Sequence, residues 1–221
     1  MTISDPTSPT PKPAPAHEAA QRRDWPAYFD RMVGKPARDT LLAAIEAFGE
    51  IDPADPPLAA DLGCGAGRDV VELLESGWRV WAQDASSDGL DRLRAHPICA
   101  RAIKDGRLEV VLADFADTRP PRAALVNASF SLPFCPPSGF DALWALIYGA
   151  VEPGGRFSGQ FFGDRDDWAI LEDRTHLTRA QVLGLFSKSI LESFREEDRP
   201  SAHAGEAHKH WHVFHVVARK G

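Results

Sequence analysis

The sequence predicts an α/β fold: a seven-stranded, mostly parallel sheet with helices on both faces and an antiparallel hairpin at its C-terminal end. Three observations lead to this prediction. Short apolar runs alternate with helical segments from residue 58 onward, a glycine-rich turn follows the first run, and two strand-like segments end the chain. Such alternation is typical of parallel strands joined by helices, whereas two successive strands without a helix between them pair antiparallel.

Each element follows from its own pattern. The apolar runs with strand character are LAADLG, WRVWAQD, RLEVVLADF, AALVNASF and GRFSGQFFGD. The helical segments between and after them are RDVVELLESG, DGLDRLRAH, FDALWALIYGAV and TRAQVLGLFS. The closing pair, KSILESFREED and HKHWHVFHVVARK, has no helical period, so we expect it to form the hairpin.

The N-terminal region differs from the rest of the chain. Residues 1–20 contain five prolines among Ser, Thr and Ala, a composition that buries too little apolar surface to offset chain entropy, so we predict a disordered tail. Residues 21–50 show apolar side chains at three- and four-residue spacing, which predicts a helical lid ahead of the sheet. Residues 51–221 are then predicted to form one domain.

Charge and cysteine content narrow the class of protein. The chain has 25 Lys and Arg against 32 Asp and Glu, a net charge of −7, which disfavours a nucleic-acid partner. Three widely spaced cysteines indicate neither a disulfide framework nor a cysteine zinc site. No apolar run approaches about 20 residues and no signal peptide is recognisable, so we expect a soluble cytoplasmic protein without a membrane partner. No feature indicates an oligomeric state.

The glycine-rich turn reads DLGCGAGRD from Asp61 to Asp69, and a helical segment follows it. Glycine has no Cβ and tolerates positive φ, so a ligand can lie directly against the backbone here. A tight turn with no ligand is the alternative. The combination of strand, glycines, helix and later acidic residues favours a nucleotide-like ligand.

Spacing and charge around the turn distinguish between such ligands. Dinucleotide-binding enzymes use GxGxxG. Here the spacing is GxGxG: the third glycine is Gly67, and Arg68 stands where the third glycine of the dinucleotide motif would be. Asp61 and Asp69 add negative charge where a pyrophosphate would lie at a helix N-terminus. S-adenosylmethionine carries a sulfonium and an α-amino group and no phosphate, so acidic residues suit it better than NAD.

Two later carboxylates end the next two strands. Asp84 lies 19 residues after Gly65, where an α/β crevice needs an acid for both ribose hydroxyls. Its alternative role is to cap the following helix, although Ser86 is nearer to the helix start. Asp114 can accept from an adenine amino group while Phe115 packs on the ring, and the alternative there is an acidic loop with a core phenylalanine.

These motifs resemble the class I S-adenosylmethionine-dependent methyltransferases, which have a Rossmann-like fold. The resemblance runs from about residue 61 to residue 220 and rests on DLGCGAGRD, AQDAS, ADF, VEPGGRF and the terminal hairpin. Three segments are similar to those of tellurite-resistance-type small-molecule methyltransferases: GRD after the glycines, ESGWRVWAQD and HVFHVVARK. The resemblance implies S-adenosylmethionine as cofactor, bound by Asp61, Gly63, Gly65, Gly67, Arg68, Asp84, Ala85, Ala113, Asp114 and Phe115.

The loop after the fourth strand is expected to face the methyl acceptor, because substrates of this fold approach above the strand ends. Asn127 can place an oxygen near the methionine amino group. Amino-group methyltransferases resemble this loop with an Asn-Pro-Pro-Tyr or Phe element, but both prolines are missing here, which argues against nucleic-acid or protein-amide methylation. We place Ser129, Phe130 and Phe134 at the acceptor, with core packing as the alternative for the two phenylalanines.

Two groups of residues outside these motifs were also candidates for the site. Tyr28 and Arg38 can close over the cofactor, with Arg38 pairing with its carboxylate, while a surface arginine and a packing tyrosine are the alternative. Tyr28 is also placed at the acceptor, in the lining of the mouth. Five histidines lie near the C-terminus, at positions 203, 208, 210, 212 and 215. Alternate histidines share a strand face, as metal ligands require, but no Cys or Asp partner is close by, so we predict no metal site. The alternative is that these histidines border the substrate mouth.

The sequence therefore predicts an enzyme that methylates a small molecule by in-line transfer from S-adenosylmethionine. Alignment of two bound reactants supplies much of the acceleration, so a general base is optional and no catalytic residue is assigned. One alternative is an NAD-dependent oxidoreductase, against which the GxGxG spacing and the terminal hairpin argue. The other is a cofactor-binding protein of the same fold without turnover.

Overall fold

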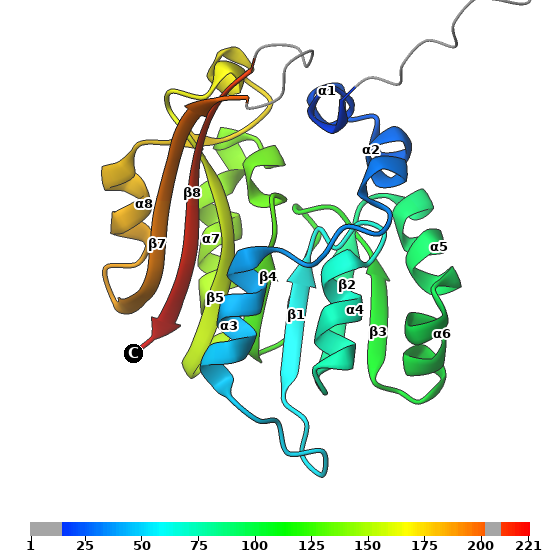
Figure 1. The fold of residues 1–221 in the computed structure, drawn as a ribbon. Coiled ribbons are helices and arrows are strands. Elements are labelled where there is room, and N and C mark those ends of the chain that lie inside the picture. Colours follow the sequence, from blue (N-terminus) through cyan, green and yellow to red (C-terminus); the bar gives the residue numbers. More distant parts are fainter. Residues whose placement is uncertain (1–14, 202–208) are drawn as a thin grey trace, which may run out of the picture.

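Eight strands form one mixed sheet at the centre of the structure, a computed structural model that describes residues 15–201 and 209–221 (Figure 1). The strand order is β3-β2-β1-β4-β5-β8-β7, and β6 pairs with β5 beside this path. Strand β8 runs antiparallel to both of its neighbours, and the other pairs are parallel. The strands are β1 (Leu58–Leu62), β2 (Arg79–Asp84), β3 (Leu108–Leu112), β4 (Ala123–Ala128), β5 (Val151–Gly163), β6 (His176–Leu177), β7 (Ser189–Pro200) and β8 (His210–Lys220).

Helices cover both faces of this sheet. They are α1 (Ala16–Gln21), α2 (Trp25–Met32), α3 (Asp39–Phe48), α4 (Arg68–Glu75), α5 (Ser87–Ala95), α6 (Pro97–Lys104), α7 (Pro137–Ala150) and α8 (Arg179–Leu185), with 3-10 turns η1 (Leu132–Phe134) and η2 (Asp167–Ile170). Buried side chains of α3 to α6 share one core with the sheet, and those of α7 and α8 share the other. Within the described ranges, no helix is long and apolar enough to cross a bilayer.

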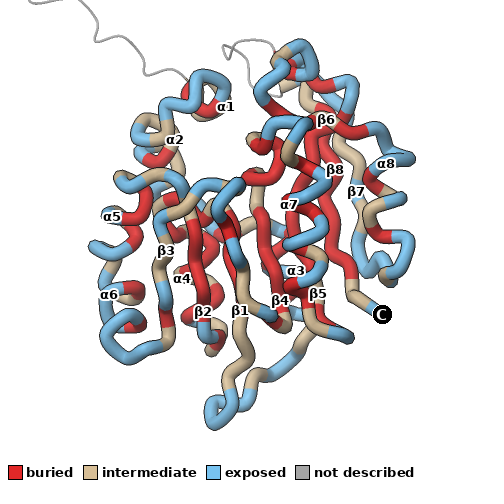
Figure 2. Tube along the Cα trace, turned by 180° about the vertical axis from the view of Figure 1, so that it is seen from behind, coloured by how far each residue is buried: buried red, intermediate tan, exposed pale blue. Residues whose placement is uncertain are grey.

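Neighbouring residues of the central strands enter opposite cores. In β1, Ala59 packs with the α3–α6 layer and Ala60 with the α7–α8 layer, and Leu125 and Val126 of β4 divide in the same way. Successive side chains of a strand point to opposite faces, so a strand covered on both faces is apolar throughout. Figure 2 shows these strands as the buried centre of the molecule. This explains why LAADLG and AALVNASF lack a polar alternation.

The strand count differs from the predicted seven. The additional strand, β6, has two residues, which pair with Phe162 and Gly163 of β5. A strand this short has no alternation to detect, so the sequence contains no signal for it. The other seven strands, with the antiparallel pair β7 and β8 at one edge, confirm the predicted fold class.

The predicted boundaries in the N-terminal region need correction. Residues 1–14 of the predicted tail lie outside the described residues, but residues 16–20 belong to α1, where Ala19 and Ala20 are buried. Arg174 donates a hydrogen bond to the Gln21 carbonyl (3.0 Å), a tertiary contact that composition cannot reveal. Helices α1 and α2 lie above the ends of the strands (Figure 1). Helix α3, which was expected in the lid, packs against β5 and β8 and covers the sheet.

Trp78, between α4 and β2, supports the packing of the α3–α6 layer. Its side chain is fully buried and meets the Phe48 ring edge-on at 4.9 Å between centroids. The Nε1 atom has no hydrogen-bond partner among the described residues. We expect Trp78→Ala to lower the free energy of unfolding by about 3–5 kcal/mol because it leaves a large cavity.

Trp78→Phe is the matched control for this prediction. It keeps a ring against Phe48 and removes the unpaired N–H, so its cost should be about 1 kcal/mol. Urea unfolding monitored by circular dichroism measures both variants. Equal losses for the two would contradict the packing role of the ring.

Candidate active site

One large cavity lies at the carboxyl ends of β1, β2 and β4, on the side of the sheet where α1 and α2 lie. The cavity has a volume of about 1430 Å³, whereas a pocket for one small ligand typically occupies about 300–1,000 Å³. It therefore has room for a nucleotide-sized cofactor and a second molecule. All predicted site residues line it except Ala113 and Asn127.

The glycine turn between β1 and α4 forms the floor of one end of the cavity. Gly63, Gly65 and Gly67 have φ angles of +70°, +55° and +86°, which side chains with a Cβ rarely adopt. A Cβ on Gly65 would lie 2.7 Å from the Phe29 ring of α2. The sequence indicated that a ligand requires this glycine, and the structure adds that close packing of α2 requires it too.

Asp84, at the end of β2, braces the same turn. Its Oδ2 accepts from the Gly65 backbone N–H (2.8 Å) and its Oδ1 from that of Ser86 (2.7 Å). Burial raises the pKa of Asp84, and the backbone hydrogen bonds oppose this shift. Ser86 is the cap of α5, since its hydroxyl accepts from the Gly89 N–H (3.1 Å). Asp84 is therefore not needed as a helix cap and faces the cavity.

A buried amide connects the elements below this end of the cavity. Asn127 of β4 donates to Asp61 Oδ1 (2.8 Å) and Asp69 Oδ2 (3.2 Å), and it accepts from the hydroxyls of Ser158 (2.7 Å) and Ser129 (3.3 Å). Its side chain is fully buried. Its side-chain oxygen is occupied by these two hydroxyl donors, so the predicted contact with a methionine amino group stays a prediction for the backbone oxygen of Asn127.

Asp61 is an incompletely paired carboxyl group at the cavity. The residue is 1% exposed and its Oδ2 has no hydrogen-bond partner among the described residues. Burial and the nearby charge of Asp69 raise the pKa of Asp61 to about 8. A buried carboxyl with an unused oxygen fits a cationic amino group, which would supply both the missing donor and the missing charge.

The residues expected near the adenine differ in their contacts and in whether they line the cavity. Asp114 Oδ1 accepts from the backbone N–H groups of Ala116 (2.8 Å) and Asp117 (3.1 Å), so this carboxylate shapes its own loop. Phe115 and Ala85 line the cavity. Ala113 does not line the cavity. Its N–H donates to the Asp84 carbonyl (3.1 Å), and its own carbonyl accepts from the Gln83 side chain.

Aromatic side chains enclose the other end of the cavity. Tyr28, Phe130 and Phe134 take part, as predicted from the sequence. Arg38 lies between the two ends: its guanidinium is 4.3 Å from the Phe130 ring centre and donates to the Tyr28 hydroxyl (3.4 Å). Four aromatic residues that the sequence did not indicate join this wall, namely Trp25, Phe162, Trp168 and Trp211.

Strands β7 and β8 complete the wall with charged and polar residues. Arg195, Glu197 and Arg199 alternate along β7, so they share one face, and all three line the cavity together with His215 of β8. Glu197 pairs with Arg199 (3.0 Å) and Arg195 (3.2 Å). The sequence allowed His215 at the substrate mouth, as the alternative to a metal ligand, and this histidine does line the cavity. For the three β7 residues it carried no signal, since they face the cavity only through the pairing of two distant segments.

Comparison with known proteins shows which proteins this chain resembles. A family model described as "Methyltransferase domain" matches residues 59–155, the region of the glycine turn and of Asp61, Asp84 and Asn127. Over this segment the chain is similar to the class I S-adenosylmethionine-dependent methyltransferases. The similar proteins are enzymes, and the similarity supports S-adenosylmethionine as the cofactor. The comparisons give no support to an NAD-dependent oxidoreductase.

Curated relatives of this chain include carboxy-S-adenosyl-L-methionine synthases. The protein from Vibrio cholerae is 27% identical over an alignment of 165 residues, and the match covers 67% of this chain and 66% of the relative. The protein from Shewanella oneidensis is 31% identical over an alignment of 156 residues, and that match covers 65% of this chain and 63% of the relative. The chain thus spans slightly less than two thirds of the length of these relatives.

Solved structures share the fold. TehB from Haemophilus influenzae has a TM-score of 0.69 at 14% identity, covering 88% of this chain and 66% of that one. The 1,6-didemethyltoxoflavin-N1-methyltransferase of Burkholderia thailandensis, bound to 1,6-didemethyltoxoflavin and S-adenosylhomocysteine, has a TM-score of 0.63 at 21% identity. The match covers 99% of this chain and 98% of the Burkholderia chain.

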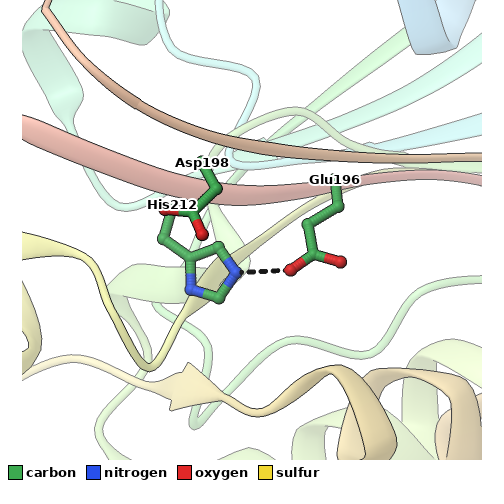
Figure 3. Close-up of side chains that lie close together, drawn as sticks. All are labelled: Glu196, Asp198 and His212. Atoms are coloured by element: carbon green, nitrogen blue, oxygen red, sulfur yellow. Dashed lines mark hydrogen bonds and ion pairs between the residues drawn. The ribbon is translucent and has the colours of Figure 1, made fainter.

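One cluster of side chains at the β7–β8 pair has ligand types that suit a metal ion. Figure 3 shows Glu196 and Asp198 of β7 beside His212 of β8, with His212 Nε2 hydrogen-bonded to Glu196. The Arg165 guanidinium is 2.8 Å from Glu196 and 2.6 Å from Asp198, so it neutralises these carboxylates. His215 faces the other side of the strand, and positions 203 and 208 lie outside the described residues.

The raised pKa of Asp61 makes the stability of the ligand-free protein depend on pH. In the unfolded chain this carboxyl titrates near 3.9, and in the folded protein near 8. The folded state therefore binds the proton more tightly, and the stability from this group, present at low pH, is lost as pH rises to about 8. We expect Asp61→Asn, which resembles the protonated form, to gain in melting temperature over the wild type as pH rises from 5 to 8.5.

Differential scanning fluorimetry at pH 5, 7 and 8.5 measures this difference. Asp91→Asn is the control, because Asp91 is an exposed α5 carboxylate and its removal should give no comparable trend. A constant difference between Asp61→Asn and the wild type at all three pH values would refute the shifted titration.

Proposed function

We propose that this methyltransferase transfers the methyl group of S-adenosylmethionine to a small, partly apolar acceptor. The observation that carries the proposal is the division of one cavity into two chemically different ends. One end has the glycine turn, Asp61 and Asp84, and the other has aromatic side chains from α2, η1 and β5. Two reactants bound side by side need such a cavity, because transfer is fast only when donor and acceptor are aligned.

The first end is assigned to the cofactor, which supplies an electrophilic methyl group on a positively charged sulfur. Asp84 accepts from the ribose hydroxyls, Asp61 receives the α-amino group, and Arg38 pairs with the carboxylate. Asp114 and Phe115 hold the adenine. Three acidic groups suit a ligand with two positive centres, and the orphaned Asp61 Oδ2 supports this orientation.

The second end is assigned to the acceptor. Phe130, Phe134 and Trp25 provide apolar contact, and the Trp25 and Phe134 rings meet edge-on at 4.9 Å between centroids. Apolar walls with few polar groups are typical of small-ligand pockets. The net charge of −7 disfavours nucleic acid, whose non-specific binding depends on basic surfaces. The similarity to the Burkholderia methyltransferase of 1,6-didemethyltoxoflavin also supports a small acceptor.

Asp84→Ala tests the cofactor assignment. Loss of charge-assisted hydrogen bonds to both ribose hydroxyls should weaken S-adenosylmethionine binding by about 1.5–3 kcal/mol, measured by isothermal titration calorimetry. Asp91→Ala removes an exposed carboxylate from the neighbouring helix α5 and should bind as the wild type does. Wild-type affinity in a folded Asp84→Ala protein would remove this carboxylate from the cofactor site.

The acceptor class is tested by S-adenosylhomocysteine release with a panel of probes. The panel contains 8-hydroxyquinoline, 8-mercaptoquinoline, lumazine, phenethylamine, selenite and tellurite, beside tRNA, DNA and a protein extract. We expect turnover with small probes only. Turnover confined to the macromolecules would contradict the proposal, as would mass-spectrometric detection of carboxy-S-adenosylmethionine in place of a methylated probe. Cofactor binding without any turnover would favour the non-catalytic alternative.

A further inference from the structure

His215 stands at the boundary between the two ends of the cavity. It is 8% exposed and lines the cavity with its register neighbours, Gln160 of β5 and Arg195 of β7. Its ring meets the edge of the Phe130 ring at 6.0 Å, and the Arg38 guanidinium covers Phe130 at 4.3 Å. His215 is therefore close to both the proposed cofactor carboxylate partner and the aromatic wall.

The position of the Phe130 ring next to His215 is held by the backbone. Phe130 has a φ of +53°, an unusual conformation for a residue with a bulky side chain. Its N–H donates to Gln160 Oε1 (2.9 Å), and Gln160 Nε2 donates to the Thr40 hydroxyl (2.8 Å). Strained backbone that surrounding contacts maintain is concentrated at functional sites. The contacts thus fix the geometry around the imidazole before any ligand binds.

One nitrogen of His215 is oriented by a carboxylate and the other is left for a ligand. Nε2 lies 3.3 Å from Glu197 Oε2, and a carboxylate accepts, so Nε2 carries the proton. Nδ1 is then an acceptor. It makes no hydrogen bond within the described ranges. His215 lines the cavity, and Nδ1 is not one of the fully buried side-chain atoms that lack a partner. An imidazole held at one nitrogen by a carboxylate is the usual arrangement of a general base.

We propose that His215, oriented by Glu197, takes the proton from the acceptor during methyl transfer, and that the acceptor atom is a hydroxyl oxygen or a ring N–H of an aromatic molecule. This inference rests on the proposed function. The acceptor lone pair forms the bond to the methyl carbon while the carbon–sulfur bond breaks and its electron pair stays on sulfur. The acceptor proton moves to Nδ1, and Glu197 stabilises the imidazolium that results.

The charges around His215 restrict which acceptors this base can serve. Burial lowers the pKa of His215 to about 4, and Arg195 and Arg38 add to the shift while Glu197 opposes it. A weakly basic imidazole is neutral at pH 7 and cannot take a proton from an alkylammonium. A hydroxyl or ring N–H becomes strongly acidic as its methyl bond forms, so a weak base suffices there. A thiol that ionises in solution needs no base.

A matched pair of probes separates this role from a structural one. 8-Hydroxyquinoline and 8-mercaptoquinoline are similar in shape, but near neutral pH the oxygen of the first keeps its proton, whereas the sulfur of the second is largely thiolate because its proton lies on the ring nitrogen. We expect His215→Gln to lower kcat for 8-hydroxyquinoline by about 100-fold or more and to leave the thiol rate and the KM for S-adenosylmethionine within about threefold of the wild type. Glu197→Gln should give an intermediate loss. His210→Gln, which alters a more exposed histidine of the same strand, should behave as the wild type.

A second measurement does not depend on turnover. Long-range ¹H–¹⁵N NMR of the histidine rings in the full chain should show His215 as the neutral Nε2–H tautomer from pH 8 down to pH 6. An Nδ1–H tautomer or an imidazolium at pH 7 would overturn the inference. So would equal losses on both probes for His215→Gln, full activity of that variant, or wild-type turnover restricted to thiols and phenethylamine. Absence of turnover with every probe would refute the proposed function instead, and the tautomer would then decide the placement of the proton.

Discussion

The buried amide of Asn127 is the interaction on which the cavity floor depends. It uses both N–H groups and both lone pairs, and thereby joins β1, α4, β5 and the loop after β4 through Asp61, Asp69, Ser158 and Ser129. A fully satisfied buried polar group holds its partners in one arrangement. Because the amide satisfies only one oxygen of Asp61, the other remains for a ligand, and the energetic cost of leaving it unpaired favours a cationic partner there.

The same principle links the N-terminal helices to the cofactor end. Asp84 uses both oxygens on backbone N–H groups of the glycine turn and the α5 start, and the turn leaves space at Gly65 that the Phe29 ring of α2 fills. Helix α2 therefore rests on the very backbone that a ligand contacts. A carboxylate can accept further hydrogen bonds, so bracing the turn and holding a sugar are compatible roles for Asp84.

Charge is distributed unevenly around the cavity despite the net charge of −7. Carboxylates gather at the end formed by β1 to β3, Arg195 and Arg199 line the β7 wall, and Arg38 lies between the two ends. Other acidic residues of β7 are neutralised on the opposite face, where Arg165 binds Glu196 and Asp198. The electrostatic character of each end thus follows from which face of β7 a residue occupies, and the summed charge of the chain conceals it.

The sequence by itself determined the parallel sheet, the terminal hairpin and the cofactor end, because local signals encode them: Gly63, Gly65 and Gly67 are adjacent in the chain, and Asp84 ends a recognisable strand. It did not reveal α1 or β6, whose six and two residues are too short for a periodic pattern, nor that Asn127 lies beneath the cavity. Of the acceptor wall, the sequence indicated Tyr28, Phe130 and Phe134, and the tertiary structure decided the rest. His215 and Glu197 meet because β7 and β8 pair in one register. The alternation of side chains along a strand shows which residues share a face, but it does not show which face of an edge hairpin borders a cavity.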